Sequence, residues 1–139
     1  MFRTIVIGLD GSERSLKALL YGQNLGEKYG AKLILVHAYP HTSDLRDFEG
    51  YASLLARRKN SGERVLDSGA KMLADTPIAF ERDLLEGPAA EAVMSVAETR
   101  KADLIILGTR GMGAVKGLVF GSVATKVSHH APCPVLLIR

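Results

Sequence analysis

The chain has 139 residues, of which 47% are hydrophobic and 24% are charged, with a net charge of +3 at pH 7 and a pI near 9.1. This length suits one domain, the composition is ordinary for a soluble globular protein, and no apolar run approaches the length of a membrane span. The basic residues are scattered and no aromatic residues alternate with them, which argues against nucleic-acid binding. The single cysteine, Cys133, excludes an internal disulfide, and the N-terminus has no signal-peptide pattern, so we expect a cytoplasmic protein.

The first third of the chain predicts two buried strands with a helix between them. Residues 2–9 and 32–38 are Ile-, Val- and Leu-rich runs, typical of parallel strands that are covered on both faces. Ser12 is expected to cap a helix that ends at Gly30. Residues 40–50 are polar and irregular. Two interpretations stay open for them, a lid over a ligand and a surface crossover, and the second is favoured.

The rest of the chain continues the alternation. Residues 51–74 predict one long helix, and residues 78–84 predict a more polar strand that suits a sheet edge. A third helix is expected to open at residues 86–88, followed by a strand at 103–107, a helix from Ser122 to about His130 and a fifth strand at 135–138. Strands that alternate with helices predict an α/β fold, in which a five-stranded parallel sheet lies between two layers of helices.

A glycine-rich segment follows the fourth predicted strand. Gly108 and Gly111 come first, and after nine further residues Gly121 and Ser122 open the next helix. Glycine amides can approach an anion closely, and a helix N-terminus adds free N–H groups and a partial positive charge. Because ligands of open parallel sheets bind at the carboxyl ends of the strands, this segment predicts a phosphate-binding site. A simple tight connection is the alternative, but nine residues are long for a plain turn.

Other nucleotide-binding and catalytic motifs are missing from the sequence. It contains no P-loop motif, and the glycines at 111 and 113 do not continue into a dinucleotide-binding fingerprint. The first strand–helix turn lacks the Ser-Gly-Gly run of adenylating enzymes with similar folds. No Ser-His-Asp, Cys-His or paired-carboxylate arrangement is readable, so we predict no catalytic residues.

The spacing Gly108-x-x-Gly111-(nine residues)-Gly121-Ser122 resembles the nucleotide-binding signature of the ATP-binding branch of the universal stress protein family. Residues 5–12, 33–38, 86–88 and 131–138 are similar to the same family, in the same order. The resemblance implies one domain over residues 1–139 with an adenine nucleotide alpha hydrolase-like fold and strand order 3-2-1-4-5. That order places Asp10 beside Gly108.

The resemblance also implies a ligand and a partner. The ligand is ATP, or ADP or AMP, with Mg²⁺ or Mn²⁺ held at Asp10. The implied nucleotide-binding residues are Gly8, Leu9, Asp10, Ala38, Gly108, Thr109, Arg110, Gly111, Gly121, Ser122 and Val123. Asp10 has an equally weighted interpretation as a helix-capping carboxylate, and a small residue at Ala38 would also serve packing alone. The implied partner is a second copy of the chain, paired through Val135, Leu136, Leu137 and Ile138.

Three functions follow from these expectations. The favoured one is an ATP-binding sensor or regulator of the stress response, with at most weak ATP hydrolysis. The first alternative is a slow Mg-dependent ATPase or a nucleotide-dependent transferase in which Asp10 positions a metal. The second alternative is a dimerisation module without a ligand, which is disfavoured because every glycine of the signature is present.

Overall fold

Strands and helices alternate along the chain in the order that the sequence predicts. The computed structural model describes residues 1–110 and 120–139. Its elements are β1 (Thr4–Gly8), α1 (Glu13–Tyr29), β2 (Lys32–Tyr39), the 3₁₀ helix η1 (Ser43–Leu45), α2 (Tyr51–Leu73), β3 (Phe80–Glu86), α3 (Ala89–Thr99), β4 (Leu104–Gly108), α4 (Ser122–His130) and β5 (Val135–Ile138).

The five strands form one parallel sheet in the order β3-β2-β1-β4-β5, which confirms the expected topology. β1 lies in the centre and pairs with β4 on one side, with Ile7 opposite Ile106 in the register. The strand order therefore reverses between β1 and β4. Because both strands run in the same direction, the residues that follow Gly8 and Gly108 meet at the same edge of the sheet, at the switch point where ligands of such folds bind.

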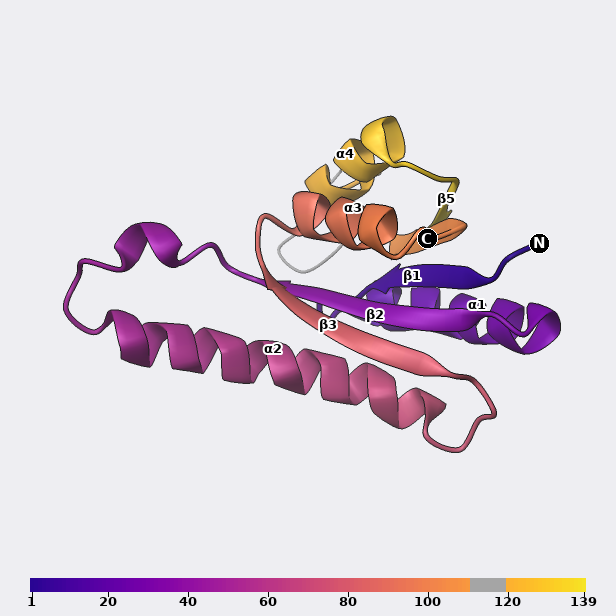
Figure 1. The fold of residues 1–139 in the computed structure, drawn as a ribbon, viewed down its shortest axis with the longest axis horizontal. Coiled ribbons are helices and arrows are strands. Elements are labelled where there is room, and N and C mark those ends of the chain that lie inside the picture. Colours follow the sequence, from indigo (N-terminus) through magenta and orange to yellow (C-terminus); the bar gives the residue numbers. More distant parts are fainter. Residues whose placement is uncertain (111–119) are drawn as a thin grey trace.

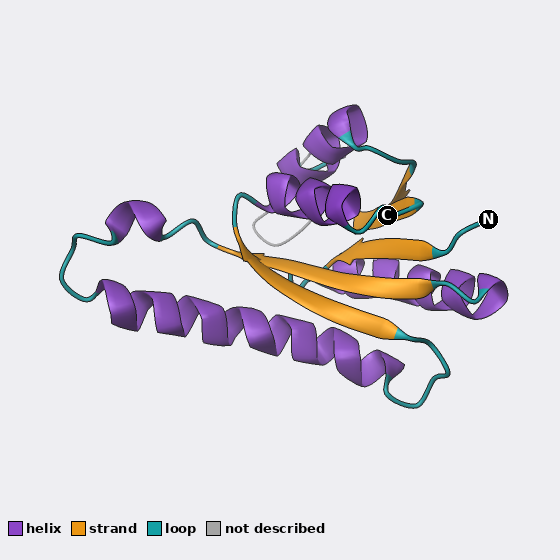
Figure 2. Ribbon diagram, in the orientation of Figure 1, coloured by secondary structure: helices purple, strands orange, loops and turns teal. Residues whose placement is uncertain are grey.

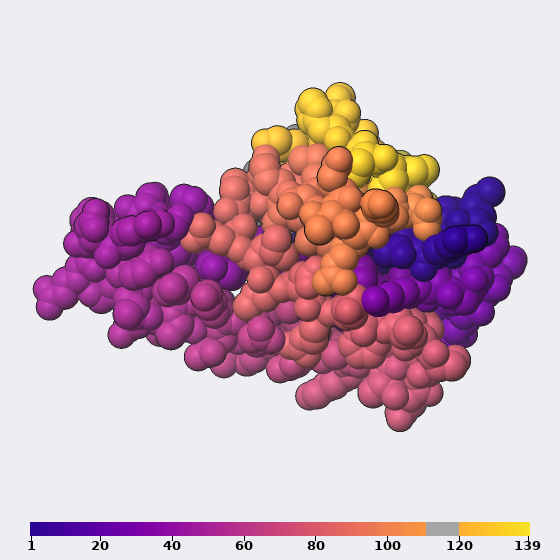
Figure 3. Space-filling view, viewed as in Figure 1, coloured from indigo at the N-terminus to yellow at the C-terminus, as the bar shows by residue number. Residues whose placement is uncertain are grey.

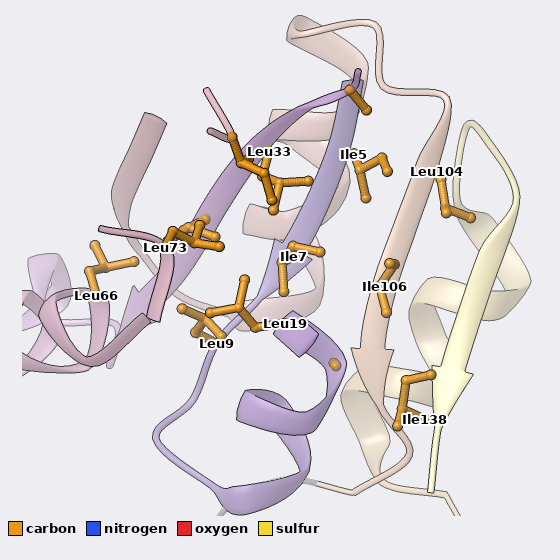
Figure 4. Close-up of a cluster of buried hydrophobic side chains, with 14 residues drawn as sticks. Ile5, Ile7, Leu9, Leu19, Leu33, Leu66, Leu73, Leu104, Ile106 and Ile138 are labelled. Carbon is orange, nitrogen blue, oxygen red and sulfur yellow. The ribbon is translucent and has the colours of Figure 1, made fainter. Parts of the chain in front are cut away.

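Helices cover both faces of the sheet, so the core has two halves. Helices α1 and α2 pack on one face, where Ile5, Ile7 and Ile106 are fully buried (Figures 1 and 4). Helices α3 and α4 pack on the other face, over Val6 and Ile105. Successive strand residues point to opposite faces. This explains why the central strands are apolar at nearly every position, and Figure 2 shows the sheet between its two helical layers.

The ends of α1 are those that the sequence predicts. The Ser12 hydroxyl oxygen accepts a hydrogen bond from the backbone N–H of Ser15 at 3.2 Å, and Glu13 places a negative charge in the first turn. Gly30 ends the helix in the left-handed conformation, with φ of 68°, and its N–H donates to the Gly26 carbonyl. Both predicted caps are therefore confirmed.

β3 is an edge strand, as predicted, but it is shifted by two residues towards the C-terminus. It starts at Phe80 and includes Glu86, which the sequence had suggested as part of a helix opening. The ladder with β2 continues to this end, with Glu86 opposite Tyr39, and the Gly87 N–H donates to the Tyr39 carbonyl at 2.7 Å. The acidic side chains of this strand form ion pairs: Arg100 contacts Glu81 at 2.6 Å and Asp83 at 3.1 Å.

The segment between β2 and α2 is tied to the end of β3. The Glu86 carboxylate accepts hydrogen bonds from the backbone N–H groups of Thr42 and Ser43, each at 2.9 Å, and from the Ser43 hydroxyl. Arg58 of α2 donates to the Thr42 hydroxyl oxygen at 2.8 Å. With the first half of α2, this segment forms a lobe that projects beyond the sheet (Figures 1 and 3). These bonds favour the surface-crossover interpretation over the lid.

Among the described residues, no helix is both long enough and apolar enough to cross a lipid bilayer.

Candidate functional site

The turn that follows β1 is held by its own hydrogen bonds. The Leu9 N–H donates to the Val36 carbonyl at 2.8 Å, and its carbonyl oxygen lies 2.7 Å from Nδ1 of His37, which donates when that nitrogen carries the proton. Both backbone groups of Leu9 are therefore used inside the protein, and its side chain is buried. Leu9 thus positions the turn that presents Asp10.

Asp10 lies at the carboxyl end of β1, directly before α1. Its Oδ1 accepts a hydrogen bond from the Ser12 N–H at 2.9 Å, and its own N–H donates to the Ser15 hydroxyl at 3.3 Å. Ser15 is buried and donates back to the Ser12 carbonyl at 3.0 Å. The structure therefore supports the interpretation of Asp10 as a carboxylate that fixes the turn before the helix.

The loop that follows β4 is anchored at Thr109, which is 2% exposed. The Thr109 N–H donates to the Ile138 carbonyl of β5 at 2.8 Å, and its carbonyl accepts from the Gly121 N–H at 2.6 Å. The two ends of the glycine-rich segment, Gly108 and Gly121, are thereby brought together. Helix α4 begins beside the carboxyl end of β4, as expected.

The first turn of α4 carries exposed positive potential. Gly121 occupies the N-cap position, and no side chain of the described residues caps this end or adds an acidic group to its first turn. Helices α2 and α3 also lack a side-chain cap. Location distinguishes α4 from α2 and α3, because its N-terminus opens next to Gly108 and Thr109 at the switch point.

The N-terminus of α1 approaches the same place from the other face of the sheet. A Cβ added to Gly108 would lie 2.9 Å from Cβ of Arg14 and 3.2 Å from its backbone carbonyl carbon, so only glycine permits this approach. Nη1 of Arg14 donates to the Thr109 hydroxyl oxygen at 3.5 Å. The ends of β1 and β4 and the first turns of α1 and α4 thus converge at one edge.

The comparison with known proteins decides the family. A model of the universal stress protein family matches residues 1–139. The chain belongs to the universal stress protein family. A universal stress protein of Thermus aquaticus, encoded in the QAH/OAS sulfhydrylase 3′ region, is 41% identical over 140 residues, with 100% of both chains covered. Universal stress protein MJ0531 of Methanocaldococcus jannaschii is 31% identical over 145 residues, which cover 100% of this chain and 83% of the relative.

Solved universal stress proteins share the fold. UspA from Lactobacillus plantarum superposes with a TM-score of 0.87 at 22% identity, covering 99% of this chain and 98% of its own. A universal stress protein in complex with cAMP has a TM-score of 0.67 at 26% identity, covering 99% and 97%. One from Archaeoglobus fulgidus in complex with dAMP has a TM-score of 0.76 at 20% identity, covering 100% and 98%.

The structure brings most of the predicted site residues of this universal stress protein chain to one edge of the sheet. Gly111 lies outside the described residues. Val123 is partly buried and packs against the core half under α3 and α4. Ala38 lies at the carboxyl end of β2, opposite Leu85 in the register, and is also partly buried. The residues gathered at the switch point are Gly8, Leu9, Asp10, Gly108, Thr109, Arg110, Gly121 and Ser122.

A hollow of about 400 Å³ lies between β3 and α3, away from the switch point. Its two arginines are already neutralised. Arg82 contacts Glu63 at 2.7 Å and Asp67 at 2.8 Å, while Arg100 contacts Glu81 and Asp83. Because these cations have acidic partners, the hollow offers little to an anionic ligand, and the switch point remains the candidate site.

The sequence analysis did not identify Arg14 as a residue that contacts the candidate site. One signal was available: a cation in the first turn of a helix opposes the helix dipole, so an arginine at that position is unusual. The contact with Thr109 spans 95 residues and has no local pattern. The anchoring of Leu9 by His37 was likewise beyond the reach of the sequence, since it depends on the pairing of β1 with β2.

Proposed function

We propose that this chain binds an adenine nucleotide, ATP in the first place, at the edge of the sheet where β1 and β4 end. The observation that carries the proposal is the junction of Gly121 with Thr109, which sets the N-terminus of α4 against the glycine at the end of β4. Backbone N–H groups and the positive end of a helix are the donors that phosphate groups prefer. Complexes of other universal stress proteins with cAMP and dAMP support an adenine nucleotide as the ligand.

A divalent cation fits this site only if the nucleotide brings it. The described residues include no cluster of three or more His, Cys, Asp or Glu side chains that could hold a metal by themselves. Magnesium is commonly bound by one or two carboxylates together with substrate phosphates. We therefore propose that Asp10 holds Mg²⁺ or Mn²⁺ together with phosphate oxygens, where the cation neutralises charge on the phosphates.

The proposed role is that of a nucleotide-dependent regulator in the stress response. A binding site that uses backbone groups for recognition needs no general base, and its occupancy can report the nucleotide level. The alternative, slow hydrolysis or group transfer, is tested with radiolabelled ATP. Turnover that persists unchanged in Gly121→Val would count against any activity at this site, whereas turnover lost in that variant would favour the enzyme.

Ser122 allows a matched test of the binding proposal. It is the first residue of α4, and its hydroxyl can donate to a phosphate oxygen, whereas Ser128 lies on the same helix with its hydroxyl bonded to the Thr125 carbonyl at 2.9 Å. We expect Ser122→Ala to weaken ATP binding about 10- to 100-fold, the loss of one hydrogen bond to a charged group, and Ser128→Ala to leave it unchanged. Equilibrium dialysis measures both, and equal affinities would contradict the placement of the phosphates at α4.

We also propose that two copies pair through β5. This strand is at the edge of the sheet, and the Ile105 N–H donates to the Pro134 carbonyl on its inner side. Backbone alternation therefore turns the N–H and C=O groups of Val135 and Leu137 outward. Pairing with a second strand protects an apolar edge of this kind from aggregation. Sedimentation equilibrium is expected to show a dimer at micromolar concentration, and a monomer throughout would remove the proposal.

A further inference from the structure

Arg14 occupies an unusual position in the first turn of α1. It is half-buried, and the backbone at Gly108 packs directly against its Cβ. Its guanidinium has one hydrogen bond, the long 3.5 Å contact with the Thr109 hydroxyl, and within the described residues it forms no ion pair. Arg82 and Arg100, by contrast, each contact two carboxylates.

Two physical effects oppose a cation at this position. The N-terminus of a helix carries partial positive charge, which repels the guanidinium. Partial burial also removes water from a charge that has no acidic partner in the described part of the chain. Arg14 therefore weakens the fold unless something else compensates it. A bound anion would provide that compensation.

The surroundings of Arg14 show where such an anion would lie. Thr109 joins the arginine to the α4 N-terminus, because its hydroxyl accepts from Arg14 and its carbonyl accepts from Gly121 at 2.6 Å. Helix α1 covers one face of the sheet and α4 covers the other. A chain of phosphates that spans the edge between them would receive the guanidinium at one end and the N–H groups of α4 at the other.

We propose that Arg14 binds the phosphate chain of the nucleotide from the α1 side, and that it makes the site prefer nucleoside di- and triphosphates over monophosphates and nucleosides. This inference rests on the proposed function and adds to it a residue and a ligand class. A planar guanidinium can form two parallel hydrogen bonds with phosphate oxygens, and such charge-assisted bonds are the strong ones. A longer phosphate chain reaches both α1 and α4, whereas a single phosphate reaches one of them.

The test compares two substitutions at this position. Arg14→Leu removes the charge and keeps much of the aliphatic part of the side chain. Arg14→Lys keeps the charge but lacks the planar guanidinium that can form two parallel hydrogen bonds. The exposed Arg57 of α2 supplies the control, Arg57→Leu. Affinities for ATP, ADP, AMP and adenosine are measured by titration calorimetry on nucleotide-free protein with Mg²⁺ present.

We expect Arg14→Leu to weaken ATP and ADP binding about 10- to 100-fold and to change adenosine binding less than about two-fold. Arg14→Lys should recover part of the loss, and Arg57→Leu should match the wild type. The thermal midpoint of nucleotide-free Arg14→Leu should equal or exceed that of the wild type, since an unfavourable charge is removed. A purely structural arginine would do the opposite: it would lower the midpoint and leave the ratio of ATP to adenosine affinity unchanged.

The possible failures are distinguishable. If the wild type binds ATP and all variants keep the wild-type preference for ATP over adenosine, the role of Arg14 is overturned and nucleotide binding stands. If the wild type binds no nucleotide, the proposed function fails and the role of Arg14 fails with it.

Discussion

The close approach of α1 to Gly108 predicts the effect of one added methyl group. In Gly108→Ala the new Cβ would lie 2.9 Å from Cβ of Arg14, 3.2 Å from its carbonyl carbon and 3.3 Å from the Arg110 carbonyl oxygen. Ordinary contacts of a Cβ lie at 3.4–4 Å, so α1 and the end of β4 must separate by about 0.5 Å. The atoms that clash are backbone atoms or fixed to the backbone, and no side-chain rotation relieves them.

Overpacking of this kind costs about 1–3 kcal/mol of the free energy of unfolding, or roughly 3–10 °C in the thermal midpoint. Urea unfolding of nucleotide-free protein, followed by circular dichroism, measures it. We also expect weaker ATP binding, because the separation displaces Arg14 from Thr109.

Gly26→Ala is the matched control. It lies in α1, the helix that Gly108 contacts through Arg14, and an added Cβ there makes only ordinary contacts at 3.5 Å. Helix propensity then favours alanine by up to about 1 kcal/mol, so this variant should be neutral or stabilised. If Gly108→Ala were as stable as Gly26→Ala and bound ATP like the wild type, the close approach of α1 to β4 would be refuted.

Two further predictions concern carboxylates. Backbone N–H donation from Thr42, helped by Ser43, holds the pKa of Glu86 below its ordinary value. The ionised Glu86 therefore stabilises the fold at pH values above its ordinary pKa, and this stabilisation is lost as the pH falls through the lower pKa of the folded state. The urea midpoints of the wild type and of Glu86→Gln should therefore converge on acidification. A difference between the two midpoints that stays constant with pH would contradict this. The N–H groups of Thr4 and Arg3 likewise lower the pKa of Asp103, with hydrogen bonds of 3.0 and 2.7 Å. Asp103→Ala should lower the free energy of unfolding by about 1.5–3 kcal/mol, and an unchanged urea midpoint at neutral pH would refute the importance of these bonds.

Local patterns in the sequence were sufficient to predict the architecture. The apolar runs, Ser12 and Gly30 each act through neighbours in the chain, and the structure confirms the strands and caps that they predict. The sheet order came from the family resemblance, since alternation of strands and helices alone leaves several orders open.

The features that the sequence did not reveal depend on contacts between distant residues. Glu86 extends β3 because it pairs with Tyr39 and binds the backbone of Thr42, 44 residues away. The contact of Arg14 with Thr109 forms only once β4 lies beside β1. No periodicity or spacing encodes such contacts.

The most direct test of nucleotide binding at the switch point follows individual backbone amides. In a ¹⁵N–¹H NMR titration of nucleotide-free protein with Mg·ATP, the signals of Gly108, Gly121 and Ser122 should shift and saturate together. The signal of Gly30, at the far end of α1, should stay in place. An absence of shifts, or shifts confined to Ser95 and Thr99 in the hollow beside β3, would contradict the proposed site.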